Sequence, residues 1–376
     1  MKRILFIMPA LQGGGAEKVL IDILKNMDRS RYDLTLLLEY KEDVYTSSIP
    51  EDVKVRSLYR RSGIWLERFH RGLGIVRCYN LFHSLVYRLA FLWMMRKESY
   101  DTIISFMEGE AVRIHSYLKH RAKRNVSWIH IDFKKKHWSL EFFRNKRHEC
   151  ECYSMMDKIV FVSDDARKSF LEIYPVSENS TKVLYNLIDR DAILKLSDKT
   201  IEKRKMTICM TGRLNQQKRY DRALEVMKIL KNDGVDVELW VQGTGELEAE
   251  LKELANTLGV AEMCRFWGFV RPPYPYMKSA DIYLSTSEAE GYPLVLCEAL
   301  CLGLPVVATD ITGAHEILEE SKYGMLVKEN VDDIYRGVKR MIEDQDLREA
   351  YRAKAIERAD AFSVSKILDE IDSILW

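Results

Sequence analysis

The chain has 376 residues, of which 47% are apolar and 31% are charged. This length exceeds what one hydrophobic core usually supports, so we expect two domains, and the composition excludes a disordered or fibrous protein. The formal net charge of +1 leaves no overall field for nucleic acid, so charge has to be considered patch by patch. The seven cysteines include no Cys-x-x-Cys pair, which favours reduced thiols over a disulfide framework.

The apolar segments are too short for a membrane span, which needs roughly 20 apolar residues. The segment that comes closest, Leu85 to Met95, is interrupted by Arg88. The N-terminal apolar run follows a basic start, but no small-residue cleavage site comes after it, so we expect a first strand rather than a signal peptide. These features predict a cytoplasmic protein that does not span a membrane.

The first half alternates short apolar runs with helical patterns. Ala16 to Met27 carries apolar residues at helical spacing, as a helix packed on a sheet does. Such alternation predicts an α/β domain with a parallel sheet. Its strands are expected at Ile4 to Met8, Leu34 to Glu39, Thr102 to Phe106, Val126 to Ile131 and Lys158 to Ser163.

The second half repeats this organisation after a polar, charged segment, Asp189 to Arg204, which we interpret as the linker. The expected domains are therefore residues 1–190 and 200–361, both Rossmann-like. Because ligands bind at the carboxyl ends of the strands in such sheets, we expect the two domains to face each other across a ligand-binding cleft. The second sheet is expected to contain Met206 to Thr211, Val235 to Val241, Cys264 to Phe269, Ile282 to Ser285 and Pro305 to Thr309, with helices at Asp221 to Lys231 and Glu246 to Leu258.

A pair of acids, Glu290 and Glu298, flanks a Gly-Tyr-Pro turn in the second half. Carboxylates accept hydrogen bonds from sugar and ribose hydroxyls, and Gly291 would let backbone amides approach an anionic group. A phosphate-bearing, hydroxyl-rich ligand fits this arrangement. For an isolated pair, the alternative is a capping acid followed by a solvated helix glutamate.

This segment resembles the E-x7-E signature of glycosyltransferase family 4, a group with the GT-B fold. Thr211-Gly-Arg-Leu-Asn-Gln-Gln-Lys is similar to the family's strand-end motif, so Arg213 and Lys218 would grip the donor diphosphate. The resemblance extends to Gly243-Thr-Gly-Glu-Leu and to Phe266-Trp-Gly-Phe-Val, which lies where the base usually docks. It implies that the donor is bound by Arg213, Lys218, Phe269, Val270, Glu290, Gly291, Tyr292 and Glu298.

Arg213 and Lys218 also have a physical rationale of their own. A departing nucleoside diphosphate gains negative charge as the glycosidic bond breaks, and fixed cations stabilise it. These fixed cations would replace the metal ion that other phosphate chemistry uses, so we expect a metal-independent reaction without a cofactor. One departure from the family is Arg219, which stands where glycine is common after the lysine and could alter the loop that positions Lys218.

In the first half, Gly13, Gly14 and Gly15 follow the first strand and open the first helix. Bare amides at such a turn can face phosphates. The spacing is not the dinucleotide fingerprint G-x-G-x-x-G, because Lys18 stands where the last glycine would be. The segment resembles the family's GGAE-type loop, which implies that Gly14 and Gly15 face the donor diphosphate from the opposite domain; a plain tight turn is the alternative.

His130 ends a predicted strand and corresponds to a family histidine near the donor sugar, which implies a hydrogen bond to that sugar. A strand-end histidine whose hydrogen bonds are satisfied internally is the alternative. Asp132 is a weaker candidate. Glu108 and Glu110 could contact the acceptor, although acids are common in loops.

The segment from Lys54 to Lys97 contains ten Lys or Arg residues, several aromatic residues, and Glu67 as its one acid. Such a stretch suits an anionic membrane surface, at the inner face of the plasma membrane. Core helices with a solvated basic face are the alternative. Nucleic-acid binding is disfavoured, because no binding motif accompanies the charge.

The resemblance as a whole implies a retaining glycosyltransferase that uses a nucleoside diphosphate sugar, with uridine diphosphate (UDP) as the expected nucleotide. The acceptor would be a hydroxyl group, with a lipid-linked glycan of bacterial surface polysaccharide synthesis as our interpretation. The final helix, 362–376, could pack back on the first domain. The catalytic candidates are Glu290, Arg213, Lys218 and His130.

Three other functions stay open at this point. A non-hydrolysing nucleotide-sugar epimerase has the same architecture but needs no acceptor. A nicotinamide-dependent oxidoreductase is disfavoured by the missing fingerprint. A non-catalytic sugar-nucleotide-binding subunit would keep Arg213 and Lys218 without turnover.

Overall fold

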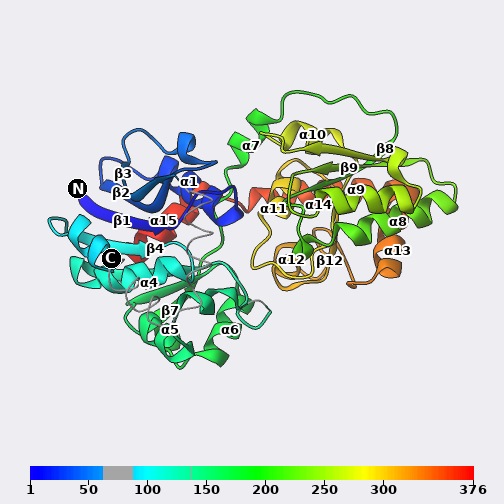
Figure 1. Ribbon diagram of the computed structural model, residues 1–376. Coiled ribbons are helices and arrows are strands. Elements are labelled where there is room, and N and C mark those ends of the chain that lie inside the picture. Colours follow the sequence, from blue (N-terminus) through cyan, green and yellow to red (C-terminus); the bar gives the residue numbers. More distant parts are fainter. Residues whose placement is uncertain (62–87, 136) are drawn as a thin grey trace. The chain divides into compact units, whose positions relative to one another are not determined.

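A computed structural model describes residues 1–61, 88–135 and 137–376 of the chain. It divides into two compact units, one of residues 1–187 with 364–376 and the other of residues 188–363 (Figure 1). Among the described residues, no helix is long and apolar enough to cross a bilayer. The six cysteines within these ranges are free thiols, and Cys78 lies outside them.

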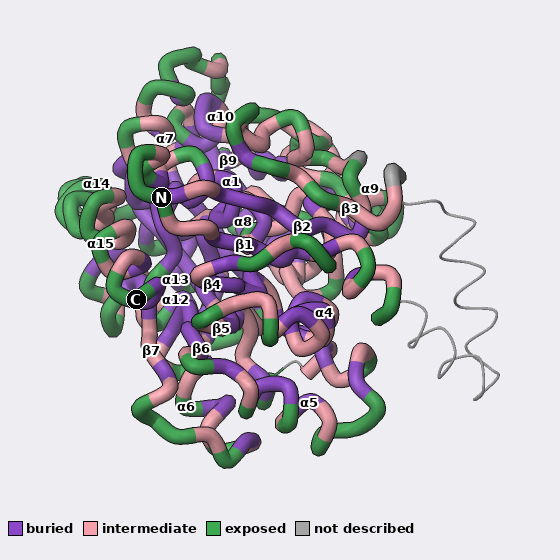
Figure 2. The backbone as a smooth tube through the Cα atoms, turned by 90° about the vertical axis from the view of Figure 1, so that its left-hand side faces the viewer, coloured by how far each residue is buried: buried purple, intermediate pink, exposed green. Residues whose placement is uncertain are grey.

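Unit 1 contains a parallel sheet, whose described strands number seven. Its central strands are continuous apolar runs, as strands covered on both faces are, and the apolar residues of β1 from Ile4 to Met8 are fully buried (Figure 2). In spatial order the strands are β3 (Lys54–Arg61), β2 (Tyr32–Glu42), β1 (Lys2–Met8), β4 (Tyr100–Ser105), β5 (Ala122–Ile129), β6 (Lys158–Phe161) and β7 (Thr181–Val183).

Helices of unit 1 follow the strands in the chain and pack on the sheet. They are α1 (Gly15–Asn26), α4 (Glu110–Leu118), α5 (Lys146–Tyr153), α6 (Asp164–Ile173) and the C-terminal α15 (Val364–Leu375). The last of these is tied to the sheet by long-range contacts: the Thr102 hydroxyl donates to the Leu375 carbonyl at 3.1 Å, and Arg124 donates to the Trp376 carbonyl at 2.6 Å. Residues 364–376 therefore belong to the same unit as residues 1–187.

Unit 2 has a parallel sheet with six described strands. In spatial order these are β10 (Cys264–Gly268), β9 (Val237–Gln242), β8 (Met206–Thr211), β11 (Ile282–Ser285), β12 (Val306–Thr309) and β13 (Met325–Val327). The helices are α7 (Arg190–Leu196), α8 (Tyr220–Asn232), α9 (Glu248–Thr257), α10 (Tyr274–Ser279), α11 (Leu294–Cys301), α12 (Thr312–Leu318), α13 (Val331–Glu343) and α14 (Gln345–Asp360).

The segment interpreted as a linker, Asp189 to Arg204, holds a helix. Asp189 caps α7 by accepting a hydrogen bond from the Ala192 amide at 2.9 Å, and Arg190 pairs with Asp360. The helix packs on α10 and α11 and belongs to unit 2. A polar segment of this length can therefore be a capped helix on a domain surface.

The strand order places the ends of particular strands together. In unit 2 the order reverses at β8, which lies between β9 and β11. In unit 1 it reverses at β1, between β2 and β4. Doubly wound sheets bind ligands at the carboxyl ends of strands at such switch points. The loops after β8, β11 and β1 are therefore the first places to look for a site.

Candidate functional site

The loop after β8 carries Lys218 on a short 3-10 turn, Gln216–Lys218. Asn215 caps this turn by accepting a hydrogen bond from the Lys218 amide at 3.2 Å. The lysine side chain folds back over Gly212, where an added Cβ would lie 3.2 Å from Lys218 Cε. Gly212 has φ +154°, so both its conformation and its lack of a side chain make room for the lysine.

Lys218 meets Glu290 from the loop after β11. The Lys218 Nζ and Glu290 Oε1 atoms are 2.5 Å apart, and the two side chains are 18% and 15% exposed. The Ser287 hydroxyl donates to the same Glu290 oxygen at 3.0 Å. The two sequence motifs thus meet in an ion pair that is largely shielded from solvent.

Further hydrogen bonds join the same two loops. The Thr286 hydroxyl contacts the carbonyls of Lys218 and Arg219 at 3.0 and 2.8 Å, and the Glu288 amide donates to the Gln217 carbonyl at 3.0 Å. Sequence reasoning did not single out Ser287, Thr286 or Gln217. Their type gives no signal, since short polar residues are common at strand ends, and only the adjacency of β8 and β11 brings them together.

Arg219, which replaces the family's usual glycine, adopts the left-handed conformation with φ 50° and ψ 47°. This conformation costs a residue with a Cβ roughly 1–2 kcal/mol. The Arg219 guanidinium pairs with Asp221 at 2.8 Å and with Glu288 at 3.2 Å, and these contacts hold the turn. The loop therefore keeps a backbone shape that glycine would adopt, and Arg219 adds a link to the β11 loop.

Arg213 takes no part in this ion pair. It is exposed, and no hydrogen bond or ion pair of its side chain is found within the described residues. The structure thus brings Lys218 and Glu290 together and leaves Arg213 reaching into solvent.

Two further glycines pack the loop after β9 directly on the β8 loop. A Cβ at Gly243 would lie 1.9 Å from the Gly212 carbonyl oxygen, and one at Gly245 would lie 2.2 Å from the Leu214 carbonyl oxygen. No side chain fits in either space. The Gly243 amide also donates to the Gly268 carbonyl at 2.8 Å, so the end of β10 joins the same edge.

The proposed base-binding residues follow β10 at this edge. Phe269 is 58% exposed, which is unusual for so large an apolar side chain, and Val270 is half-buried. An exposed ring beside a strand end is available for stacking on a planar ligand.

Glu298 and its neighbours lie deeper. Glu298, on α11, is 4% exposed, and the Tyr274 hydroxyl donates to its Oε1 at 3.1 Å. Tyr292 is also buried. Gly291 packs against α12, where a Cβ on Gly313 would lie 2.7 Å from the Gly291 carbonyl oxygen. These contacts fix the turn between the two acids.

The glycine loop of unit 1 differs from the sequence prediction. The Gly13 and Gly14 amides, expected to be bare, donate to Glu17 Oε2 at 2.6 and 3.0 Å. Glu17 is 7% exposed and closes a capping box at the start of α1. The prediction of free amides at Gly13 and Gly14 was wrong, because a carboxylate at the third helical position satisfies them. Gly15 is the first residue of α1.

His130 directly follows β5, as predicted. Its hydrogen-bond partners, Glu108 and the Phe106 backbone, belong to unit 1. Burial lowers the pKa of the ring to about 3, against a hydrogen bond with the Phe106 backbone that raises it, so the imidazole is neutral at pH 7. Its Nε2 atom is buried and has no hydrogen-bond partner within the described residues. A neutral ring with an unpartnered nitrogen can accept a hydrogen bond or, in the other tautomer, donate one.

The acids suggested for acceptor contact are engaged inside unit 1. Glu108 is 2% exposed and its Oε2 accepts a hydrogen bond from the His130 amide at 3.0 Å. Burial raises the pKa of Glu108 to about 7. Glu110 pairs with Arg113 at 2.9 Å; Asp132, the weaker candidate named beside His130, accepts from the Lys134 amide at 2.9 Å. The buried Glu108 carboxyl group therefore supports the end of β5.

The basic segment Lys54 to Lys97 is described in part, because residues 62–87 lie outside the described ranges. Within β3, Lys54 pairs with Asp33 at 2.7 Å and Arg56 with Glu98 at 3.3 Å, so their charges are partly neutralised. Residues 88–94 are helical; Phe91 is buried, whereas Leu89 and Trp93 are 54% and 68% exposed.

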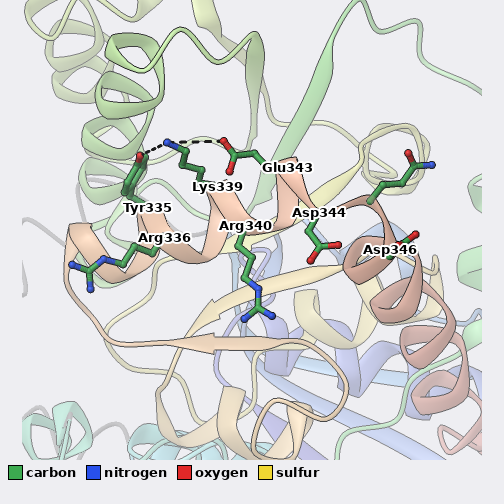
Figure 3. Close-up of a pocket in the computed structure, with 8 residues that line it drawn as sticks. Tyr335, Arg336, Lys339, Arg340, Glu343, Asp344 and Asp346 are labelled. Atoms are coloured by element: carbon green, nitrogen blue, oxygen red, sulfur yellow. Dashed lines mark hydrogen bonds and ion pairs between the residues drawn. The ribbon is translucent and has the colours of Figure 1, made fainter.

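A surface pocket of about 590 Å³ lies over α13 and the start of α14, lined by Tyr335, Arg336, Lys339, Arg340, Glu343, Asp344, Gln345 and Asp346 (Figure 3). Lys339 contacts Tyr335 at 2.9 Å and Glu343 at 4.0 Å, both one helical turn away. None of the candidate site residues lines it. In residues 1–61, 88–135 and 137–376, no group of three or more His, Cys, Asp or Glu side chains could hold a metal ion.

Comparison with known proteins matches each unit to a glycosyltransferase family model. The family model "Glycosyltransferase Family 4" matches residues 13–192, and the model "Glycosyl transferases group 1" matches residues 194–358. The two matches lie end to end and together span most of the chain.

Individual relatives agree. The chain is 32% identical over 217 residues to the Campylobacter jejuni N-acetylgalactosamine-N,N'-diacetylbacillosaminyl-diphospho-undecaprenol 4-alpha-N-acetylgalactosaminyltransferase. That match covers 57% of this chain and 59% of the enzyme, so the chain spans about three fifths of that relative's length. An uncharacterized glycosyltransferase of Haemophilus influenzae is 25% identical over the full length of both chains.

Among solved structures, Anabaena HepE in complex with UDP-glucose is similar with a TM-score of 0.77 and 21% identity, covering 100% of this chain and 99% of that chain. This likeness shows the fold of both units.

Proposed function

The chain belongs to glycosyltransferase family 4 and has the GT-B fold, and on this basis we propose that it transfers a sugar from UDP to a hydroxyl acceptor with retention of configuration. The observation that carries the proposal is the meeting of Lys218 and Glu290, one from each family motif, at the switch point of the unit 2 sheet. A cation and a carboxylate at one strand edge suit the two chemically different parts of a sugar nucleotide.

Lys218, with Arg213, binds the diphosphate and stabilises the charge that it gains as the bond to the sugar breaks. These fixed cations take the part that a metal ion plays in other phosphate chemistry, so turnover proceeds in the presence of a chelator. Glu290 accepts hydrogen bonds from sugar hydroxyls, and Glu298, oriented by Tyr274, accepts them from the ribose. Phe269 and Val270 contact the base of the nucleotide. Gly291 and Tyr292 form the turn between Glu290 and Glu298.

The reaction breaks the bond between the sugar's anomeric carbon and the phosphate oxygen and forms a bond from that carbon to the acceptor oxygen. The acceptor's proton passes to an oxygen of the leaving phosphate, on the same face of the sugar. Retention follows from this geometry, and no protein side chain is needed as a general base.

Unit 1 contributes two further candidates. His130 hydrogen-bonds the donor sugar through its unpartnered Nε2, and Gly15, the first residue of α1, is the remaining backbone candidate of the glycine loop for the diphosphate. The neutral state of His130 supports the first role, because a neutral ring can pair with a hydroxyl group.

The name of the Campylobacter relative supports a lipid-linked acceptor, since it specifies a diphospho-undecaprenol glycan and an α-linkage. We extend this acceptor class to the present chain, in synthesis of a bacterial surface glycan. Contact with an anionic membrane surface fits such an acceptor. The exposed face of residues 88–97, with Leu89, Trp93 and Arg96 at helical spacing, is the described part of that contact.

A first test is thermal stabilisation of the purified protein by nucleoside diphosphates and sugar nucleotides in the presence of a chelator. UDP or a UDP-sugar should raise the melting temperature. Absence of a shift with every nucleotide, with magnesium added as well, would contradict the donor site. Sedimentation with anionic vesicles tests membrane contact: Trp93→Ser should reduce the bound fraction, whereas equal binding of the variant would exclude this face.

A further inference from the structure

The two residues assigned to different parts of the donor contact each other directly. Lys218 Nζ, proposed for the diphosphate, lies 2.5 Å from Glu290 Oε1, proposed for the sugar hydroxyls. Among the described residues, the other hydrogen bond to the Glu290 carboxylate comes from Ser287. The carboxylate therefore takes one of the three N–H donors of Lys218 and places a negative charge beside the ammonium to which a phosphate oxygen would bind.

This pair is stronger than a surface ion pair, because both side chains are more than four-fifths withdrawn from solvent. A nucleoside diphosphate that approaches Lys218 meets the like charge of Glu290 and competes with it for the ammonium, and a displaced Glu290 loses a charge-assisted hydrogen bond. Sugar hydroxyls can replace that bond. A diphosphate without a sugar offers nothing to the displaced carboxylate.

Resting on the function proposed above, we infer that Glu290 makes the site discriminate sugar nucleotides from the free nucleoside diphosphate. With a sugar present, its hydroxyl groups engage Glu290 and Lys218 is released to the diphosphate. After the sugar has been transferred, Glu290 returns to Lys218 and weakens the hold on UDP. The carboxylate thus favours the substrate over the product and promotes product release.

The neighbouring acid, Glu288, provides a matched control. It lies two residues away on the same loop, and its carboxylate pairs with Arg219 at 3.2 Å. Replacing either acid with glutamine removes one negative charge from this loop, but only Glu290→Gln removes the competitor at Lys218. Glu290→Asp keeps the charge and shortens the side chain by one methylene, which withdraws the carboxylate from the lysine.

The experiment is calorimetric titration of the full-length protein with UDP alone, in the presence of a chelator, so that the identity of the sugar does not matter. The inference predicts that Glu290→Gln and Glu290→Asp bind UDP about tenfold more tightly than the wild type, the magnitude of one charge-assisted hydrogen bond. Glu288→Gln should bind UDP as the wild type does. Melting temperatures establish that each variant is folded.

Two results would overturn the inference and leave the proposed function in place. The first is that the wild type binds UDP and neither Glu290 variant binds it more tightly. The second is that Glu288→Gln binds UDP more tightly by the same factor as the Glu290 variants, which would mean that the net charge of the loop, and not the contact with Lys218, sets the affinity. Absence of UDP binding by the wild type and by all three variants would overturn the proposed function as well.

Discussion

Each unit places a carboxylate of its own chain where an anionic ligand was expected, but the two carboxylates are held differently. Glu17 of unit 1 accepts two backbone hydrogen bonds, from Gly13 and Gly14, and belongs to the helix that it caps. Glu290 of unit 2 contacts the tips of two side chains, Lys218 on the neighbouring strand-end loop and Ser287 on its own loop.

This difference separates a structural carboxylate from an exchangeable one. Removing Glu17 from its amides would leave part-buried donors at a helix start without this partner and would cost stability. Removing Glu290 from Lys218 only requires the rotation of flexible side chains, and a ligand phosphate can take its place. A glycine-rich loop is therefore weaker evidence for a phosphate site than a shielded lysine paired with an acid from another motif.

Lys218→Ala is the substitution that could break the comparison most clearly. UDP affinity should fall about 100-fold, because the variant loses the cation that pairs with the diphosphate. Calorimetric titration measures this loss, and Lys228→Ala, an exposed lysine on α8, serves as the control. Wild-type affinity in the Lys218 variant would show that the site lies elsewhere.

Glu108 adds a third carboxyl group to the comparison of Glu17 and Glu290. It is buried in unit 1, and its pKa is set by burial, backbone hydrogen bonds and the charge of Glu149 rather than by a cation. Its pKa of about 7 in the folded state lies above the ordinary 4.5, so the folded state binds this proton more tightly, and the resulting stability is lost as pH rises through 7. Relative to the wild type, Glu108→Gln should therefore gain about 2 kcal/mol in free energy of unfolding between pH 5 and pH 8.

Urea unfolding at the two pH values measures this gain, with exposed Glu178→Gln as the control. A difference between Glu108→Gln and the wild type that stays constant with pH would refute the assignment.

Glu17→Ala tests the structural side of the comparison directly. The free energy of unfolding should fall by about 1–2 kcal/mol through loss of the cap, while UDP affinity stays at the wild-type level. Glu17→Gln should lose less, because its amide oxygen can accept the same bonds. Thermal unfolding and UDP titration check both parts, and an unchanged melting temperature would mean that the cap contributes nothing.

The smallest expected effect concerns Arg219. Glycine at this position removes the cost of the left-handed conformation but also removes two ion pairs, each worth under about 1 kcal/mol at a partly exposed site. Alanine loses the pairs and keeps the strain. Arg219→Gly should therefore be more stable than Arg219→Ala by about 1 kcal/mol in urea unfolding, and equal stability of the two would argue against strain at this turn.

The strands that sequence predicted well are those buried on both faces. Ile4 to Met8 lies within β1 and Thr102 to Phe106 overlaps β4, because central parallel strands are continuous apolar runs. The edge strand β3 was interpreted as part of a basic segment, since alternate Lys and Arg residues hide its strand pattern. The short strands β7 and β13 have too few residues for any pattern.

Some features of the candidate site could likewise be predicted from the sequence and others could not. Lys218 and Glu290 were found from their motifs, but their ion pair depends on the adjacency of β8 and β11, which no local pattern encodes. The Glu17 cap was within reach of sequence reasoning, because an acid three residues after the N-cap is the signal of a capping box. Arg219 could be flagged as a departure, whereas its left-handed conformation had to be observed.

Hydrogen exchange of the backbone amides with and without UDP, in the presence of a chelator, tests the donor site most directly. The account predicts slower exchange on UDP binding in residues 212–219 and 286–294, the two loops that carry Lys218 and Glu290. UDP binding that leaves both loops unchanged and slows exchange at other strand ends would contradict it.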